Sequence, residues 1–401
     1  MTCQPLYLEA ESSKNPASGT TSRPLRVLTL TPFYPSADDP TQGRFISEPL
    51  AHIRDSGVTN TTIAVRPAYQ RRPIGVDDGP ARWKRYVRIP TNLGLPTAGN
   101  FLAPALVQFV AEEQRARPFD LIHAHSALPC GHAAMLLSKY YSIPFVVTVH
   151  GLDVFFTRQA RGLTGTWCRH VTEEVYRSAG AVVCISEKVR EHIRRGVNAN
   201  TTVIYNGVAT DTFGPGDASE HSVTVLSVGN LIPIKGHAGL LRAYSKLSGT
   251  IPACTLEIIG DGPERRNLSQ LASRLGIADK VTFRGRQNKA YVAAAMRKCS
   301  VFALPSTYEG LGCVYLEAMA CGKPVIGCNG QGIDEIVQPG VNGMLVQPEN
   351  ETALIEVLRR LLGDCALRQR IGEAARETIT ERFTVQHQAK QLAAVYHRCV
   401  Q

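Results

Sequence analysis

Long apolar runs are missing from the 401-residue sequence, and so is any pairing pattern among its cysteines. No segment reaches the roughly 20 consecutive apolar residues that a membrane-spanning helix needs. The N-terminus lacks the basic-then-apolar pattern of a secretory signal, so we expect a cytoplasmic protein. The eleven cysteines are an odd number without a Cys-x-x-Cys pair, which predicts reduced thiols rather than a disulfide framework or a zinc site.

Two motifs of cofactor and metal binding are also missing. No Gly-x-Gly-x-x-Gly follows the first expected strand, which argues against a nicotinamide dehydrogenase. No Asp-x-Asp triplet occurs, and we expect neither a metal nor a cofactor. His123 and His125 do not change this expectation, because we expect them to point to opposite faces of a strand and no third ligand is evident.

The composition and charge describe a soluble globular protein. With 44% hydrophobic and 19% charged residues, the chain is long enough for two domains. The net charge of +10 is uneven, with +7 in residues 1–210 and +3 in residues 211–401. Much of the first excess lies over residues 66–88, where we expect a basic loop. It is either solvated, or it lies on an anionic membrane surface or steers an anionic acceptor. No nucleic-acid-binding motif accompanies the charge, so nucleic acid is not an expected partner.

Apolar strands alternate with helical segments along the chain, which predicts an α/β protein with two doubly wound, Rossmann-like parallel-sheet domains. The segments that have the pattern of strands are 25–31, 61–65, 120–125, 143–151, 181–186, 203–208, 223–229, 256–260, 281–285, 301–304 and 324–327. The expected organisation is a disordered tail over 1–23, an N-terminal domain over 24–208, a linker over 209–220, a C-terminal domain over 221–383 and a C-terminal helix over 384–401.

The segment over 301–322 is the most informative part of the sequence. It combines an apolar strand, a Pro-Ser turn, a loop with Gly310 and Gly312, and a helix closed by a glycine. Such a unit aims free backbone N–H groups at the end of the strand, where a diphosphate fits. Glu309 and Glu317 can both face this ligand, and carboxylates bind hydroxyls better than phosphates. The pattern predicts a sugar and a ribose beside a diphosphate, although an ordinary α/β connection explains it equally well.

Glu309 and Glu317, with Gly310, Leu311 and Gly312 between them, resemble the E-x7-E signature of glycosyltransferase family 4 (glycosyl transferases group 1). Members of this family are retaining enzymes that use nucleotide-sugar donors. The resemblance implies the GT-B fold, in which two Rossmann-like domains face a cleft and the last helix crosses back to the first domain. It also implies that Glu309 contacts the donor sugar, that the loop amides hold the diphosphate or sugar hydroxyls, and that Glu317 binds the ribose.

The same resemblance implies further donor contacts. Lys235 lies where the family neutralises the diphosphate with a lysine. Gly285 and Arg286 fall where the family holds the base through backbone groups. Gly43 matches one glycine of a frequent Gly-Gly pair. Asn230 stands where an arginine is common, so a neighbouring arginine would have to supply a second cation.

Residues of the expected N-terminal domain complete the candidate site. His150 ends an apolar strand, and ligands bind at the carboxyl ends of strands in open parallel sheets. The resemblance implies that His150 lies near the donor hexose and the reacting centre. Asp153 is a candidate contact of the acceptor or a sugar hydroxyl, and His125 and Ser126 are candidates for the acceptor pocket. A structural role explains these residues equally well.

The expected activity is transfer of a hexose-type sugar from a UDP- or GDP-sugar to an acceptor hydroxyl with retention. His150, Lys235 and Glu309 are the expected catalytic residues. The expected acceptor is a glycan or a lipid-linked molecule, in envelope polysaccharide or lipid-linked glycan synthesis, at the inner face of the cell membrane. The alternatives are a sugar-nucleotide epimerase or phosphorylase on the same fold, or a non-catalytic nucleotide-sugar-binding protein.

Overall fold

The structure is a computed structural model, and it describes residues 23–36, 39, 41–70, 80–90, 92–151, 162–216, 223–249, 251 and 254–401. Four expectations therefore lie wholly or partly outside the described residues: the tail over 1–23, the basic loop over 66–88, the linker over 209–220, and Asp153.

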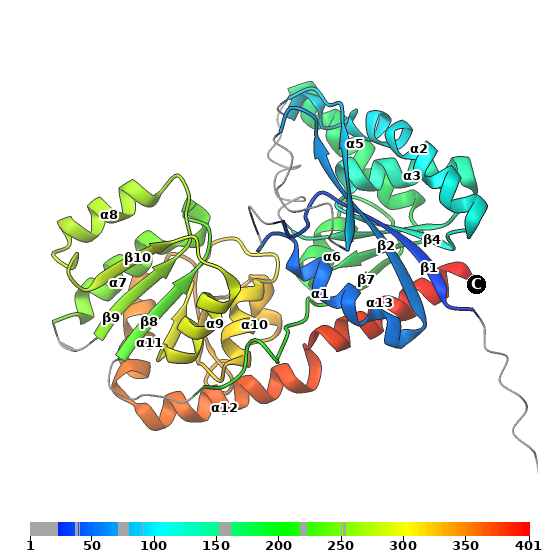
Figure 1. Cartoon of the computed structure of the whole chain (residues 1–401). Helices are drawn as coiled ribbons and strands as arrows, with labels where there is room; N and C mark the ends of the chain where they lie inside the picture. The colour runs from blue at the N-terminus through cyan, green and yellow to red at the C-terminus, as the bar shows by residue number, and fades with distance from the viewer. Residues whose placement is uncertain are drawn as a thin grey trace, which may run out of the picture.

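Two parallel sheets form the framework of the molecule (Figure 1). The first has the strand order β3-β2-β1-β4-β5-β6-β7 and the second the order β10-β9-β8-β11-β12-β13. We call the part around the first sheet the first lobe and the part around the second sheet the second lobe. The strands of the first lobe are β1 (Leu25–Thr31), β2 (Val58–Pro67), β3 (Ala81–Tyr86), β4 (Leu121–His125), β5 (Phe145–Val149), β6 (Ala181–Cys184) and β7 (Thr201–Val203).

The second lobe repeats the architecture on a smaller sheet. Its strands are β8 (Val223–Val228), β9 (Cys254–Ile259), β10 (Val281–Gly285), β11 (Val301–Ala303), β12 (Val325–Cys328) and β13 (Met344–Val346). The expected fold class, an α/β protein with two parallel sheets, is confirmed. The exact domain boundaries stay a prediction.

Helices lie between the strands and cover the sheets. The longer helices are α1 (Arg44–His52), α2 (Ala98–Ala116), α3 (His132–Tyr141), α5 (Gly162–Ser178), α6 (Glu187–Arg194), α7 (His237–Leu247), α8 (Arg265–Arg274), α9 (Lys289–Lys298), α10 (Cys313–Ala320), α11 (Glu351–Gly363), α12 (Cys365–Arg382) and α13 (Val385–Val400). The short helical turns are η1 (Ile53–Ser56), η2 (Asn92–Gly94), η3 (Ala127–Gly131), η4 (Pro233–Lys235) and η5 (Gly332–Glu335). Among the described residues, no helix is long and apolar enough to cross a membrane.

The first sheet is buried on both faces, which explains the continuous apolar runs in its strands. Every residue of β4, β5 and β6 is buried. Successive residues of a strand point into different hydrophobic clusters. Leu28 packs in a cluster with helices α2 and α3, and its neighbour Val27 packs in another cluster with α13. This alternation follows from the two-residue period of a strand.

Helix α13 continues from α12 of the second lobe and runs along the first lobe (Figure 1). Thr384 caps its start and forms a capping box with His387. Leu392 and Tyr396 then pack in the cluster that contains Val27 of β1. The expected C-terminal helix over 384–401 corresponds to α13, and this helix contacts the first lobe.

The structure differs from the sequence prediction at three elements. The expected basic loop over 66–88 contains the edge strand β3, which pairs in parallel with residues 62–67 of β2. Only its end residues, Ala81 and Tyr86, are buried, and basic residues lie between them. The sequence therefore lacks the alternation of apolar and polar residues that indicates a strand. Strand β13 has only three residues, too few to show a period. The expected strand over 203–208 is wrong, because β7 ends at Val203.

The start of helix α6 joins the two lobes. The side chain of Ser186 caps the helix. The carboxylate of Glu335, from the second lobe, accepts hydrogen bonds of 2.7 Å from the backbone N–H groups of Glu187 and Lys188. It also accepts a 2.9 Å hydrogen bond from the Tyr205 hydroxyl. A carboxylate at this position satisfies free N–H groups of the helix and interacts favourably with its dipole.

The chain crosses itself at Gly207, and this crossing has no room for a side chain. A Cβ on Gly207 would overlap the backbone carbonyl of Thr384. We expect Gly207→Ala to lower the free energy of unfolding by about 1–3 kcal/mol, because backbone atoms must shift. The matched control is Gly363→Ala, at the end of α11, where nothing lies within 4 Å of the added Cβ. Urea unfolding of both variants checks this, and equal stabilities would contradict the close crossing.

Candidate active site

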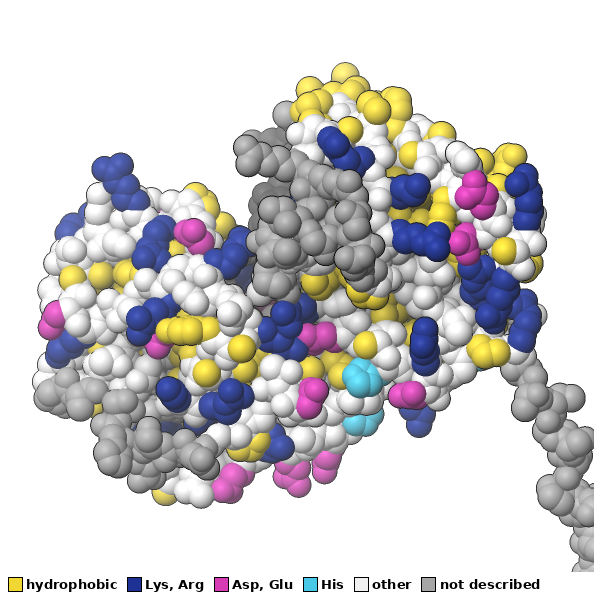
Figure 2. Space-filling model, viewed as in Figure 1, with side chains coloured by type: hydrophobic (Ala, Val, Ile, Leu, Met, Phe, Trp, Pro, Cys, Tyr) yellow, Lys and Arg dark blue, Asp and Glu magenta, His cyan; other side chains and the backbone are white. Residues whose placement is uncertain are grey.

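A cleft of about 480 Å³ opens between the lobes. Charged side chains of both signs gather at this junction (Figure 2). The first lobe contributes the loop after β1 and the start of α1, and the second contributes residues that follow β8, β9 and β10 and the first turns of α10. The charged and polar lining residues are Asp39, Thr41, Gln42, Arg44, Glu48, Asn230, Asp261, Arg286, Gln287, Lys289, Cys313 and Glu317. A volume of this size suits a small-molecule ligand.

Glu317 lies on the second turn of α10 and lines this cleft. Burial raises the pKa of its carboxyl to about 8, and nearby Lys289 opposes the shift. Glu48 raises this pKa further and Arg44 lowers it. Its carboxylate makes no hydrogen bond within the part of the chain that the structure describes. Glu317 is therefore a cleft-lining carboxyl whose pKa is raised by burial.

Two ion pairs cross the cleft from one lobe to the other. Arg286 pairs with Asp39 at 2.6 Å, and Lys289 pairs with Glu48 at 2.5 Å. The Lys289 and Glu48 side chains are mostly buried, whereas that of Arg286 is exposed. The pairs hold the loop after β1 and helix α1 close to the end of β10. Arg284, by contrast, pairs with Glu257 on the neighbouring strand and does not line the cleft.

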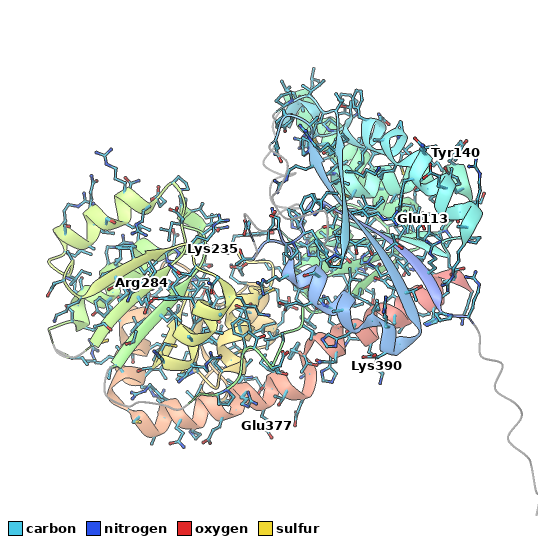
Figure 3. All side chains as sticks on the ribbon, in the orientation of Figure 1. Glu113, Tyr140, Lys235, Arg284, Glu377 and Lys390 are labelled. Carbon is cyan, nitrogen blue, oxygen red and sulfur yellow. The ribbon has the colours of Figure 1, made fainter. Side chains whose placement is uncertain are left out.

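Lys235 and Glu309 meet in an ion pair beside the cleft. Lys235 ends the turn η4 and lies on the side of the second lobe that faces the first (Figure 3). Both side chains are mostly buried. The backbone of Glu309 is also fixed: its N–H donates to the Gln331 side chain at 3.0 Å, and its carbonyl accepts from the Gly332 N–H at 3.1 Å. The structure thus places an ammonium and a carboxylate at one point.

The loop after Glu309 touches the first lobe directly. A Cβ on Gly151 would lie 2.9 Å from the Cα of Gly310, so only glycine fits on this side. The Ser186 hydroxyl donates to the Gly310 carbonyl at 2.7 Å, and the Tyr308 hydroxyl donates to the Gly151 carbonyl at 2.9 Å. Gly151 directly follows His150, so the expected catalytic loop and the expected catalytic histidine adjoin.

His150 follows β5 and is held among aromatic rings. Its Nε2 lies 3.0 Å from Nδ1 of His125, and the two rings stack at 5.2 Å. Phe45 of helix α1 packs against the imidazole at 4.7 Å. Burial lowers the pKa of His150 to about 3, so the ring is neutral at pH 7. A neutral imidazole offers one donor and one acceptor.

The expectation that His123 and His125 point to opposite faces is wrong. Their ring centroids lie 4.3 Å apart, because residues two apart in a strand share a face. No group of three or more metal-ligating side chains occurs in the described part of the chain. Ser126 follows with a positive φ of 68°, and its buried hydroxyl has no hydrogen-bond partner among the described residues.

The remaining predicted residues have backbone roles. Gly43 starts α1 with a φ of 72°, and a Cβ there would lie 2.5 Å from the Phe33 carbonyl carbon. It does not itself line the cleft. Leu311 is buried in the core, so only its backbone can face a ligand. Gly312 starts α10 with a φ of 84°, and Gly285 ends β10 with a φ of 70°.

Sequence reasoning missed the charged residues at the mouth of the cleft. Arg44, Glu48 and Lys289 line it, and Glu335 joins the lobes beside it. Lys289 comes four residues after the end of β10. The rule that ligands bind at the carboxyl ends of parallel strands could have found it. No sequence signal indicates the partner of Glu335, because that contact joins residues 148 apart.

The raised pKa of Glu317 makes stability depend on pH. The folded protein keeps a proton that the unfolded chain releases between pH 4.5 and about 8, so stability falls as pH rises through this window. Relative to Glu317→Gln, we expect the wild type to lose on the order of 2 kcal/mol between about pH 5 and about pH 9. Thermal unfolding of both proteins across this range measures the difference. Parallel pH profiles would contradict the shifted pKa.

Comparison with known proteins agrees with this geometry. The family described as Glycosyl transferases group 1 matches residues 210–378, and the family described as Glycosyltransferase Family 4 matches residues 50–212. D-inositol 3-phosphate glycosyltransferase of Streptomyces avermitilis is 30% identical over 344 residues, which cover 79% of this chain and 72% of that protein. N-acetyl-alpha-D-glucosaminyl L-malate synthase of Bacillus anthracis is 28% identical over 306 residues, covering 73% and 78%.

A solved structure shares the fold. HepE of Anabaena, in complex with UDP and glucose, superimposes with a TM-score of 0.72 at 23% identity, covering 93% of this chain and all of that chain. Two parallel-sheet lobes, a cleft between them and the family matches in both halves lead to one conclusion. The chain is a GT-B glycosyltransferase of family 4, the glycosyl transferases group 1.

Proposed function

We propose that the protein transfers a hexose-type sugar from a nucleotide diphosphate-sugar to an acceptor hydroxyl with retention of anomeric configuration. The observation that carries this proposal is the meeting of Lys235 and Glu309 at the point where the Gly310 loop touches His150–Gly151. Cation, carboxylate, backbone amides and a neutral imidazole are the groups needed to hold a diphosphate, a sugar and the reacting centre together.

The donor would occupy the cleft and this junction as one continuous ligand. In this arrangement Glu317 accepts hydrogen bonds from the ribose hydroxyls, and the end of β10 at Gly285 and Arg286 faces the base. Lys235 and the amides of residues 310–312 take the diphosphate, and Glu309 takes the donor sugar. HepE, which shares the fold, was solved with UDP and glucose, which supports a UDP-sugar as the first donor to try.

In the proposed reaction the acceptor oxygen forms a bond to the anomeric carbon, and the bond from that carbon to the donor phosphate oxygen breaks. The nucleoside diphosphate leaves with the bonding electron pair. The acceptor proton passes to the departing phosphate on the same face, which retains the configuration. Lys235 and the loop amides stabilise the charge that develops, so we propose that no metal is needed. Contact between the lobes would exclude water and favour transfer over hydrolysis.

The proposed setting is the inner face of the cell membrane, in envelope polysaccharide or lipid-linked glycan synthesis. Hydrophobic side chains gather at the top of the first lobe near α5 (Figure 2). Five exposed apolar residues, which we call the apolar tip, lie after β3 and in α5: Val87 (68% exposed), Ile89 (53%), Leu93 (64%), Leu163 (92%) and Trp167 (48%).

The segment that follows β3 lies close to helix α5. Arg88 interacts electrostatically with Tyr86 at the end of β3 and with Cys168 of α5. Exposed apolar surface beside basic side chains suits an anionic bilayer, and tryptophan favours the membrane interface. Part of the basic charge over 66–88 is engaged within the protein, since Arg82 of β3 pairs with Glu113 and Arg66 of β2 stacks on Trp83 of β3.

Removing either member of the central ion pair tests the proposed reaction. We expect Lys235→Ala and Glu309→Gln each to lower kcat roughly 100-fold, because each removes a group that faces the transition state. Lys246→Ala, on an exposed turn of α7, is the matched lysine control and should leave kcat unchanged. The assay is sugar transfer from UDP- and GDP-sugars in excess EDTA. Near-wild-type rates in both variants would contradict the site, and activity restored only by Mg²⁺ would contradict metal-free transfer.

Charge placed in the apolar tip tests the membrane proposal. We expect the double variant Val87→Asp, Leu163→Asp to sediment with phosphatidylglycerol-containing vesicles about fivefold less than the wild type, because it loses buried apolar area and gains repulsion. Val341→Asp replaces an exposed apolar residue of the second lobe and is the control. Equal sedimentation of all three proteins would rule out docking through this surface.

A further inference from the structure

A line of buried polar side chains runs from helix α13 to His150. The Tyr396 hydroxyl lies 2.6 Å from Nδ1 of His123, and Nε2 of His123 lies 2.7 Å from the Thr148 hydroxyl. The rings of His123 and His125 pack at 4.3 Å. Nδ1 of His125 is 3.0 Å from Nε2 of His150. The line begins on a helix that continues from the second lobe and ends where the first lobe meets the Gly310 loop.

The three imidazoles of this line are neutral. Burial lowers the pKa of His123 and of His150 to about 3, and it lowers that of His125 well below the ordinary value. Each ring therefore has one N–H donor and one lone pair, and its neighbours decide which nitrogen carries the proton. When the Tyr396 hydroxyl donates to Nδ1 of His123, the His123 proton lies on Nε2 and is donated to Thr148.

Between His123 and His125 the connection is the packing of two rings, whereas His125 and His150 are joined by a hydrogen bond as well. His125 is clamped between His123 on one side and His150 on the other, and its ring lies within 18° of parallel to that of His150. Phe45 closes the other side of the His150 ring. A change at His123 must therefore move His125, and a change at His125 must move His150. The cavity beside these rings, about 10 Å³, is too small for them to reorient.

Packing alone does not explain these residue types. Apolar side chains would fill the same space without the cost of burying five polar side chains. Tyr396 is fully buried, and its hydroxyl finds that partner in the first lobe, on His123. The polar line is thus a feature for which the fold itself has no need.

We propose that Tyr396 and His123 are positioning residues for sugar transfer, which fix the orientation of His150 through the packed ring of His125. This inference rests on the proposed function, because it gives His150 a task at the reacting centre. It also gives the crossing helix α13 a second role: besides tying the lobes together, it completes the catalytic side of the first lobe. Tyr396 and His123 contact neither donor nor acceptor in this arrangement.

The test compares two buried tyrosines that differ only in this connection. Tyr396→Phe removes the hydroxyl at the start of the line. Tyr244→Phe is the matched control, because the Tyr244 hydroxyl is buried in the second lobe and donates to the Cys254 carbonyl at 2.6 Å. We expect Tyr396→Phe to lower kcat about tenfold while the donor KM and the nucleotide Kd stay within about twofold. Similar losses of kcat in both variants, in step with their Tm values, would overturn the proposal.

A spectroscopic readout separates this inference from the proposed function. Ring nitrogen signals of ¹⁵N-histidine protein report tautomers, and the His150 signals are assigned by their loss in His150→Gln. We expect Tyr396→Phe to shift the His150 signals although the two residues do not touch, and Tyr244→Phe to leave them unchanged. Unchanged His150 signals in Tyr396→Phe would overturn the positioning role. If the wild type transfers sugar from no nucleotide-sugar, the proposed function fails, while the spectra still decide the positioning.

Discussion

The contact between Glu335 and the start of helix α6 is the constraint on which the rest of the site depends. A helix start leaves backbone N–H groups without partners, and here a carboxylate from the other lobe accepts two of them. The start of α6 makes two further contacts with the second lobe. The Ser186 hydroxyl donates to the Gly310 carbonyl, and the Lys188 ammonium donates to the Gln331 side chain. One helix end of the first lobe therefore contacts both the Gly310 loop and η5, which adds to the contacts that Gln331 and Gly332 make with Glu309 inside the second lobe.

Charge in the cleft is arranged so that few groups are left uncompensated. Lys235 faces Glu309, Lys289 faces Glu48, and both lysines are mostly buried. Removing one member of such a pair would leave a buried charge, which costs more than the pair itself stabilises. A diphosphate that approached Lys235 would compete with Glu309 for the same ammonium. In the proposed function, binding of the diphosphate and release of Glu309 toward a sugar hydroxyl would therefore be linked through Lys235.

Much of the fold could be predicted because the strands are buried on both faces and read as apolar runs between glycine-rich loops. The segment from β11 through α10 was the most predictable, since its glycines and glutamates are fixed by local geometry. Strand β3 was missed because it lies at an edge, where basic residues hide the period. Glu48 and Glu335 were missed for another reason: Glu48 pairs with Lys289 and Glu335 with the start of α6, and these partners lie far away in the sequence.

The crossing of helix α13 affects how the protein can be made. Leu392 and Tyr396 complete a core whose other members, such as Val27 and Ile53, lie near the beginning of the described chain. During synthesis on the ribosome, the first lobe therefore emerges without part of its own interior. It must wait, with that surface uncovered, until the whole second lobe has been translated. The first lobe can therefore complete its interior only after the second lobe has been synthesised.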